Sequence, residues 1–233
     1  MTSYESTTHV LPAVISADQP LTEELLAAVS AIAVRAEDAP PDKPHTVVLY
    51  VTGTRSGQQF SWPGPVDIGV VGKWEAALRR LEQAPAPIIA VVDGDAYGPA
   101  AELLLVADYR ILRSGSVFGF AATALGVWPS MALHRLVAQY GAGPARALAV
   151  QGRTLSAAEA HAQGLVDAVI DHDARSETTT VQAGLRLFES TAGTEIAIRR
   201  RLLLDATTTR FEDALGAHLA AADRSLRRLR AAS

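Results

Sequence analysis

Apolar positions along the chain follow two different spacings, and the two alternate from one end to the other. Short runs of aliphatic and β-branched residues predict strands at 10–15, 46–51, 88–92, 109–112, 116–120 and 166–170. Between these runs, apolar residues recur every three or four positions, as in Leu25, Val29 and Ile32, which predicts amphipathic helices. This order of elements favours an α/β fold class, in which helices pack on a sheet.

Several helix ends are marked by their own residue types. Thr22 precedes an apolar helical pattern and is positioned as an N-cap. Ser156 and Glu159 have the spacing of a capping box, and Gly164 is placed to end that helix. We also expect a helix over 129–140, and a loop over 52–65 because that segment is rich in glycine, proline and small polar residues.

The end of the chain is predicted to be mostly helical. An apolar stripe runs through Phe211, Leu215, Leu219, Ala222 and Leu226. A stripe this regular favours docking of the terminal helix, on this subunit or on a neighbouring one. We therefore divide the chain into a core over 1–185 and a C-terminal helical region over 186–233.

Composition narrows the class of protein. The chain has 233 residues, of which 48% are hydrophobic, enough for one large domain with a full core. A net charge of −4 gives no reason to expect nucleic acid as a partner, and the absence of cysteine excludes disulfides and thiolate metal sites. No apolar run approaches the roughly 20 residues of a membrane span, and the N-terminus lacks the pattern of a secretion signal. We expect a soluble, cytoplasmic protein.

Common catalytic motifs are missing. The chain has no dinucleotide-binding glycine motif after a strand, no phosphate-binding P-loop, no H-E-x-x-H and no G-x-S-x-G, and its six histidines are dispersed. We therefore predict no metal site, and no cofactor other than one that arrives as part of a substrate.

One carboxylate stands out. Glu102 lies in the stretch AVVDGDAYGPAAELLLVADYRI, just after a Gly-Pro turn and before an apolar run. An unpaired carboxylate is rarely buried, so it is either a functional group or half of a structural ion pair with lysine or arginine. Burial raises the pKa of such a group and the helix dipole lowers it, and the sequence alone leaves that balance open.

A series of motifs, in order along the chain, carries a family resemblance. They are PIIAVVDGxA at 87–96, EL at 102–103, DxRI at 108–111, FG at 118–119, LGVxP at 125–129, GR at 152–153, SAxEA at 156–160 and GLVDxV at 164–169. Over 46–171 the chain resembles the enoyl-CoA hydratase/isomerase (crotonase) superfamily. The resemblance implies a spiral of β-β-α units for the core, and a C-terminal helical region that builds a homotrimer or a hexamer.

The resemblance also implies an oxyanion hole, in which two backbone N–H groups polarise a thioester carbonyl. One donor maps best to Val66, or less well to Gly64, within the segment FSWPGPVDI. The other would come from the turn before Glu102. Pro99 occupies the position where the family has a glycine, and proline has no N–H, so we expect Gly98 or Ala100 to serve instead.

In the family, a carboxylate at Glu102 moves a proton at the α or β carbon of the acyl group. Tyr97 and Trp128 are expected to contact the substrate. Asp95 and His134 are weaker candidates that solvation explains, and Arg55 and Lys73 are basic residues that could meet the phosphates of CoA.

The hydratases carry a second glutamate where this chain has Ala122, so a two-carboxylate hydratase is not expected. One carboxylate suffices when elimination of water yields an aromatic ring. Segments 73–80 and 211–219 are similar to the small crotonase homologue of the 3,5-dihydroxyphenylglycine pathway in producers of glycopeptide antibiotics. That branch works beside a type III polyketide synthase that makes 3,5-dihydroxyphenylacetyl-CoA.

Three functional hypotheses follow. The first is an acyl-CoA lyase that dehydrates and aromatises a polyketide-derived CoA thioester. The second is a non-catalytic partner that stabilises or accelerates the polyketide synthase, since Pro99 and Ala122 together are what a crotonase fold shows after losing activity. The third, a serine hydrolase on the related protease fold, is disfavoured because no serine lies between Asp93 and Glu102.

Overall fold

The computed structural model describes residues 9–39, 45–55, 58, 60–123, 126–189 and 194–232, with only the backbone described at 122, 123, 194, 231 and 232. Parts of the predicted loop 52–65 and of the LGVxP motif lie outside these residues. Within them, no helix combines the length and the apolar composition that a membrane span requires.

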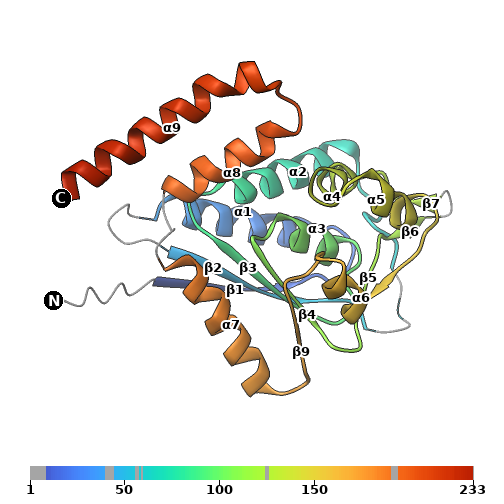
Figure 1. Ribbon diagram of the computed structural model, residues 1–233. Helices are drawn as coiled ribbons and strands as arrows, with labels where there is room; N and C mark the ends of the chain where they lie inside the picture. Colours follow the sequence, from blue (N-terminus) through green and yellow to red (C-terminus); the bar gives the residue numbers. More distant parts are fainter. Residues whose placement is uncertain are drawn as a thin grey trace.

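The centre of the molecule is a parallel sheet. In the described part of the chain it has five strands in the order β1-β2-β3-β4-β9 (Figure 1). Their bounds are β1 His9–Ser16, β2 His45–Thr52, β3 Ile88–Asp93, β4 Tyr109–Arg113 and β9 Ala168–Ile170. β1 is an edge strand, which explains how it accommodates Pro12, a residue without an N–H for the ladder.

Both faces of the central strands β2 and β3 are buried, as expected of parallel strands, whereas the edge strand β1 is largely exposed. Alternate residues of β2 face opposite sides. Val47 and Leu49 belong to the larger core cluster, and Val48 belongs to a second cluster that includes Val181 and Leu185 of a helix. In Figure 1, α1 and α2 lie on one side of the sheet and α7 on the other. The continuous apolar runs at 46–51 and 88–92 are therefore strands covered on both faces.

The helices connect and cover these strands. They are α1 Glu23–Glu37, α2 Ile68–Gln83, α3 Pro99–Val106, α4 Met131–Tyr140, α5 Ala142–Ala149, α6 Ala157–Ala162, α7 Ala174–Phe188, α8 Thr194–Ala206 and α9 Phe211–Ala232. Two short antiparallel pairs lie beside the main sheet: β5 Val117–Phe118 with β8 Leu155–Ser156, and β6 Ala122–Thr123 with β7 Gly126–Val127.

The helix ends expected from the sequence are confirmed. The Thr22 hydroxyl accepts a hydrogen bond from Leu25 N–H, and Ser156 and Glu159 form a reciprocal capping box. Gly164 follows the C-cap of α6 with a φ of +75°, a conformation that glycine adopts without a steric cost. Asp67, which the sequence did not single out, caps α2 by accepting from the N–H groups of Gly69 and Val70.

Some elements differ from the expectation. The last strand of the sheet is shorter than 166–170, and the strand expected over 116–120 is reduced to β5. The helix expected from residue 129 begins at Met131, because Ser130 takes the N-cap position and accepts from Ala132 N–H. α5 was not expected at all.

The C-terminal helices extend away from the sheet. α8 is anchored by Arg200, which donates to the backbone carbonyls of Glu82, Ala84 and Ala86 and pairs with Asp108. α9 packs on α8, and in Figure 1 it lies on the far side of α8 from the sheet. The division of the chain at residue 185, which falls within α7, stays a prediction.

Candidate active site

The turn before α3 depends on a glycine. Gly98 has a φ of +51°, and a Cβ added there would lie 3.2 Å from the indole of Trp62. A side chain at this position would be strained by the backbone and would also press closely against the ring. Gly98 therefore lets the turn approach Trp62 closely, and Pro99 begins the helix immediately afterwards.

Two tryptophan side chains contact Glu102 where the turn at Gly98 packs against Trp62. Trp62 Nε1 donates to Glu102 Oε1 at 3.1 Å, and Trp74 Nε1 donates to Glu102 Oε2 at 2.6 Å. The two indoles meet edge to face, with ring centroids 5.6 Å apart. Trp62 comes from the loop before α2 and Trp74 from α2 itself, so three separate segments converge on one carboxyl group.

The carboxyl of Glu102 is almost completely enclosed, with 2% of the residue exposed. The Ser130 hydroxyl makes a third hydrogen bond to it. Among the described residues, no lysine or arginine forms an ion pair with Glu102. The structural ion pair that the sequence left open is therefore not what accounts for this buried carboxylate.

Burial decides in which direction the pKa of Glu102 is shifted. Desolvation raises the pKa of Glu102 above that of an ordinary glutamate, and the nearby negative charge of Glu75 raises it further. Hydrogen bonds from Trp74, Ser130 and Trp62 favour the ionised form and partly offset this rise. The result is a carboxyl group that holds its proton to a higher pH than usual, which suits a group that both accepts and returns a proton.

The four backbone N–H groups proposed for an oxyanion hole divide into two pairs. Val66 N–H donates to Gly64 O at 2.9 Å, and Ala100 N–H donates to Tyr97 O at 3.1 Å. The N–H groups of Gly64 and Gly98 have no acceptor among the described residues. Of the four, Gly64 and Gly98 are the two whose N–H groups are not hydrogen-bonded within the described part of the chain.

The two aromatic residues expected at the substrate occupy different places. Tyr97 lines a cavity together with Phe60, and burial, followed by the charge of Asp95, raises the pKa of its phenol. Trp128 is half-buried against the main core, and its backbone N–H donates to Ala121 O. A role for Trp128 in substrate binding stays a prediction.

The weaker polar candidates are also located. The expectation that Asp95 is solvated is wrong. Asp95 is buried, and its carboxylate accepts a hydrogen bond from Val117 N–H at 3.0 Å. It fixes the backbone between β3 and β5 because that N–H would otherwise lack a partner. Arg55, Lys73 and His134 are exposed.

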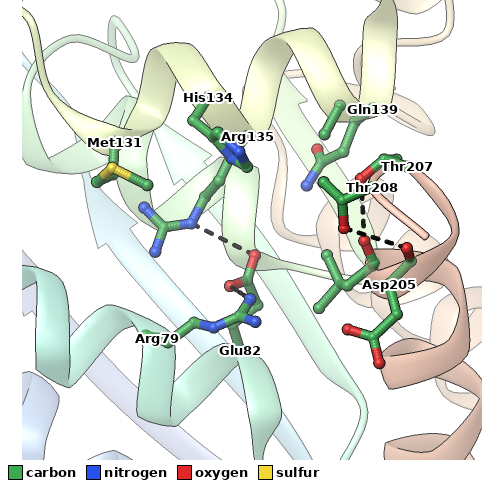
Figure 2. A pocket seen from close by; sticks show the side chains of 11 residues that line it. Arg79, Glu82, Met131, His134, Arg135, Gln139, Asp205, Thr207 and Thr208 are labelled. Carbon is green, nitrogen blue, oxygen red and sulfur yellow. Dashed lines mark hydrogen bonds and ion pairs between the residues drawn. The ribbon is translucent and has the colours of Figure 1, made fainter.

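His134 lines a cavity of about 300 Å³ that does not include Glu102 (Figure 2). This cavity lies between α2, α4, the end of α8 and the segment that follows it. On its wall, Arg135 pairs with Glu82 at 3.3 Å and with Glu75 at 3.0 Å, and Arg79 pairs with Glu82 at 2.8 Å. Its charged groups neutralise one another, so we interpret this cluster as a structural connection between α2 and α4. In the described chain, no group of three or more histidine, aspartate or glutamate residues is arranged to hold a metal ion.

Comparison with known proteins identifies the family. The family model described as enoyl-CoA hydratase/isomerase matches residues 69–228. An enoyl-CoA hydratase from Amycolatopsis orientalis is 40% identical over 210 residues, which is 90% of this chain and 93% of that protein. The chain belongs to the enoyl-CoA hydratase/isomerase family.

Solved structures support the same fold. An enoyl-CoA hydratase/isomerase from Marinobacter aquaeolei superposes with a TM-score of 0.77 at 19% identity, covering 94% of this chain and 88% of that one. A putative enoyl-CoA hydratase from Thermobifida fusca, solved in complex with acetoacetyl-CoA, gives a TM-score of 0.73 at 22% identity, covering 95% and 92%. The crotonase fold expected from the sequence is confirmed, and with it an enzyme family that processes acyl-CoA.

Sequence reasoning found Glu102 but missed the residues that hold it. Trp62, Trp74 and Ser130 lie at sequence separations of 40, 28 and 28 residues from it. One signal was available. The chain has only three tryptophans, and Trp62 lies in a loop, where a large apolar side chain with an N–H donor is unusual unless it packs inward.

Proposed function

We propose that this member of the enoyl-CoA hydratase/isomerase family is an acyl-CoA lyase that removes water from a polyketide-derived CoA thioester and so completes an aromatic ring. The product proposed is 3,5-dihydroxyphenylacetyl-CoA, a precursor in glycopeptide-antibiotic biosynthesis. The observation that carries the proposal is Glu102: a buried carboxyl with a raised pKa, held by N–H donors and by no cation among the described residues.

One carboxyl is enough for this reaction. Glu102 takes a proton from the carbon next to a carbonyl, and the electron pair of that C–H bond moves into an enolate. The enolate then expels the hydroxyl group from the neighbouring carbon as Glu102 returns its proton to it, so that one water leaves and one C=C bond forms. Aromatisation makes the step strongly favourable, which removes the need for a second carboxyl group at Ala122.

Backbone N–H groups would hold the enolate oxygen. Gly64 and Gly98 are the proposed donors, since their N–H groups are not engaged by other described residues. Loss of one such donor typically costs about 10²–10³-fold in rate, so both N–H groups are expected to contribute.

A non-catalytic role is the second candidate, and specific observations favour it. Pro99 lacks an N–H, and the N–H groups of Val66 and Ala100 are already used within the chain. A protein of this fold that has lost activity could instead bind the polyketide synthase and stabilise or accelerate it.

One assay separates the two roles. The synthase is allowed to release its CoA thioester product and is then removed, and the protein is added in an amount far below that of the thioester. A lyase converts all of the released intermediate to the aromatic product, which is measured by chromatography. If the thioester is left unchanged, and the yield rises only when both proteins are present in comparable amounts, the lyase proposal is wrong and the partner role is correct.

Assembly into a homotrimer or hexamer is also proposed. Four leucine or phenylalanine side chains of the predicted stripe on α9, Phe211, Leu215, Leu219 and Leu226, are 45–78% exposed. Burying such a face against a second copy of the chain would remove it from water. We expect light scattering to give a mass of three or six chains, and truncation before Arg210 to dissociate the core. A single chain of 24.6 kDa at micromolar concentration would contradict this.

A further inference from the structure

A second cavity lies beside the segments that hold Glu102. It is lined by Phe60 and Tyr97, and its volume is about 140 Å³. Phe60 lies two residues before Trp62, and Tyr97 directly precedes the glycine that packs on that tryptophan. The two walls of this cavity therefore continue into the loop and the turn that position the carboxyl group.

One of the residues that line the cavity has a buried hydroxyl group without a partner. Thr54 lines the cavity and is 2% exposed, and among the described residues nothing hydrogen-bonds its Oγ1. Its backbone is fixed on both sides, since Thr54 N–H donates to Asp95 O and Asp95 N–H donates to Thr54 O. A buried hydroxyl left unpaired is unfavourable, so its presence here requires a reason.

The backbone geometry keeps the cavity narrow. A Cβ added to Gly119 would lie 2.6 Å from the Tyr97 ring and 2.9 Å from the Thr154 methyl group, so both side chains pack directly on that glycine. Phe120 contributes a further aromatic wall. The outer end, where Gln58 and Thr154 lie, is exposed to solvent.

Size and lining together indicate the kind of ligand. A cavity of about 150 Å³ in a protein interior is known to hold one benzene ring. Here three lining residues are aromatic, and Thr54, Tyr97 and Thr154 of the lining carry a hydroxyl group. Rotation of Thr54 about χ1, between staggered positions, exchanges its methyl and hydroxyl groups at the cavity wall.

We propose that this cavity binds a six-membered ring carrying hydroxyl or carbonyl oxygens, and that Thr54 recognises one of those oxygens. That this ring is the acyl group of a CoA thioester rests on the function proposed above. The binding of the ring itself does not, because it depends only on the cavity and the unpaired hydroxyl.

Binding of 1,3-dihydroxybenzene to the full-length protein, measured by calorimetry with toluene as the apolar comparison, tests this proposal. Thr54→Val removes the hydroxyl at nearly constant shape. We expect it to weaken dihydroxybenzene binding by about three- to tenfold, the effect of one hydrogen bond, and to leave toluene binding unchanged. The melting temperature should stay the same or rise, because an unpaired buried hydroxyl is removed.

Thr46→Val is the matched control. Thr46 also has a buried hydroxyl without a partner among the described residues, but it does not line this cavity. This variant should change ring binding by less than Thr54→Val at a similar melting temperature. Equal binding by the wild type and Thr54→Val, or no saturable binding of dihydroxybenzene, would overturn the proposal. Ring binding with the expected Thr54 dependence in a protein that aromatises nothing would instead disprove the lyase function and leave the ring site in place.

Discussion

Two buried glutamates, Glu102 and Glu82, occupy opposite kinds of surroundings. Glu82 is 4% exposed, and its carboxylate lies between Arg79 and Arg135, as Figure 2 shows. Glu102 is 2% exposed and is held by two indole N–H groups and a hydroxyl. The exposed fraction therefore does not distinguish the two glutamates, whereas the type of side chain that contacts each carboxyl group does.

The physical difference lies in charge compensation. An arginine beside a buried carboxylate stabilises its ionised form, and the pair then acts as a fixed structural connection. Neutral N–H donors compensate only part of the lost hydration, so the proton remains exchangeable at higher pH. Substitutions in the Glu82 cluster should therefore change the free energy of unfolding and leave catalysis unchanged. Substitution of Glu102 should change catalysis.

The largest expected effect is on turnover. Glu102→Gln removes the proton-transfer group, and we expect the rate of dehydration to fall by about 10²–10⁴-fold. Because the new amide NH₂ faces an indole N–H, the variant also loses one hydrogen bond. Trp74→Phe is the matched control, since it loses a hydrogen bond at the same group and keeps the carboxyl.

Trp74→Phe should retain far more activity than Glu102→Gln. The limb of its pH–rate profile that reports Glu102 should move to higher pH, because a hydrogen bond that lowers the pKa of this group has been removed. Steady-state rates across a pH series, with circular dichroism to verify folding, provide the measurement. Equal rates in the two variants would mean that Glu102 contributes only structure.

The next effect is on stability at the other glutamate. Arg135→Met leaves Glu82 and Glu75 without their shared, buried partner, and we expect a loss of about 3–5 kcal/mol in the free energy of unfolding. Arg79→Met, which removes a half-exposed partner of the same Glu82, should cost about 1 kcal/mol or less. Denaturant titration compares them. If Arg135→Met cost no more than Arg79→Met, the structural interpretation of the cluster would be wrong.

The smallest effect is a pH dependence of stability. Glu102 has a higher pKa in the folded protein than in the unfolded chain, so its stabilising contribution is complete below the unfolded-state pKa and is lost as the pH rises through the folded-state pKa. Each pH unit between those two values corresponds to about 1.4 kcal/mol. Relative to Glu102→Gln, the wild type should therefore become less stable with rising pH. A constant difference in free energy of unfolding across that range would argue against a raised pKa.

Local signals in the sequence were enough for much of the fold. The strands β2 and β3 and the caps at Thr22 and Ser156 are set by residues close together in the chain, and the structure confirms them. α5 was missed because its sequence, AGPARALA, is mostly small residues whose apolar periodicity is weak.

Only part of the site could be predicted from the sequence, because its contacts join residues far apart in the chain. Glu102 stood out as a lone carboxylate in an apolar run, but its indole partners are 28 and 40 residues away. The pairing of Arg135 with Glu82 spans 53 residues. Periodicity predicts which face of a helix is buried, and it carries no information on which distant side chain lies opposite.

A titration of the Glu102 carboxyl itself tests most directly whether its pKa is raised. The protein is labelled with ¹³C at the glutamate carboxyl carbons, and the Glu102 resonance is assigned by its absence from the Glu102→Gln spectrum. We expect a midpoint above the ordinary glutamate pKa of about 4.3 and a further rise in Trp74→Phe. A midpoint at or below the ordinary value, unchanged in Trp74→Phe, would contradict this expectation.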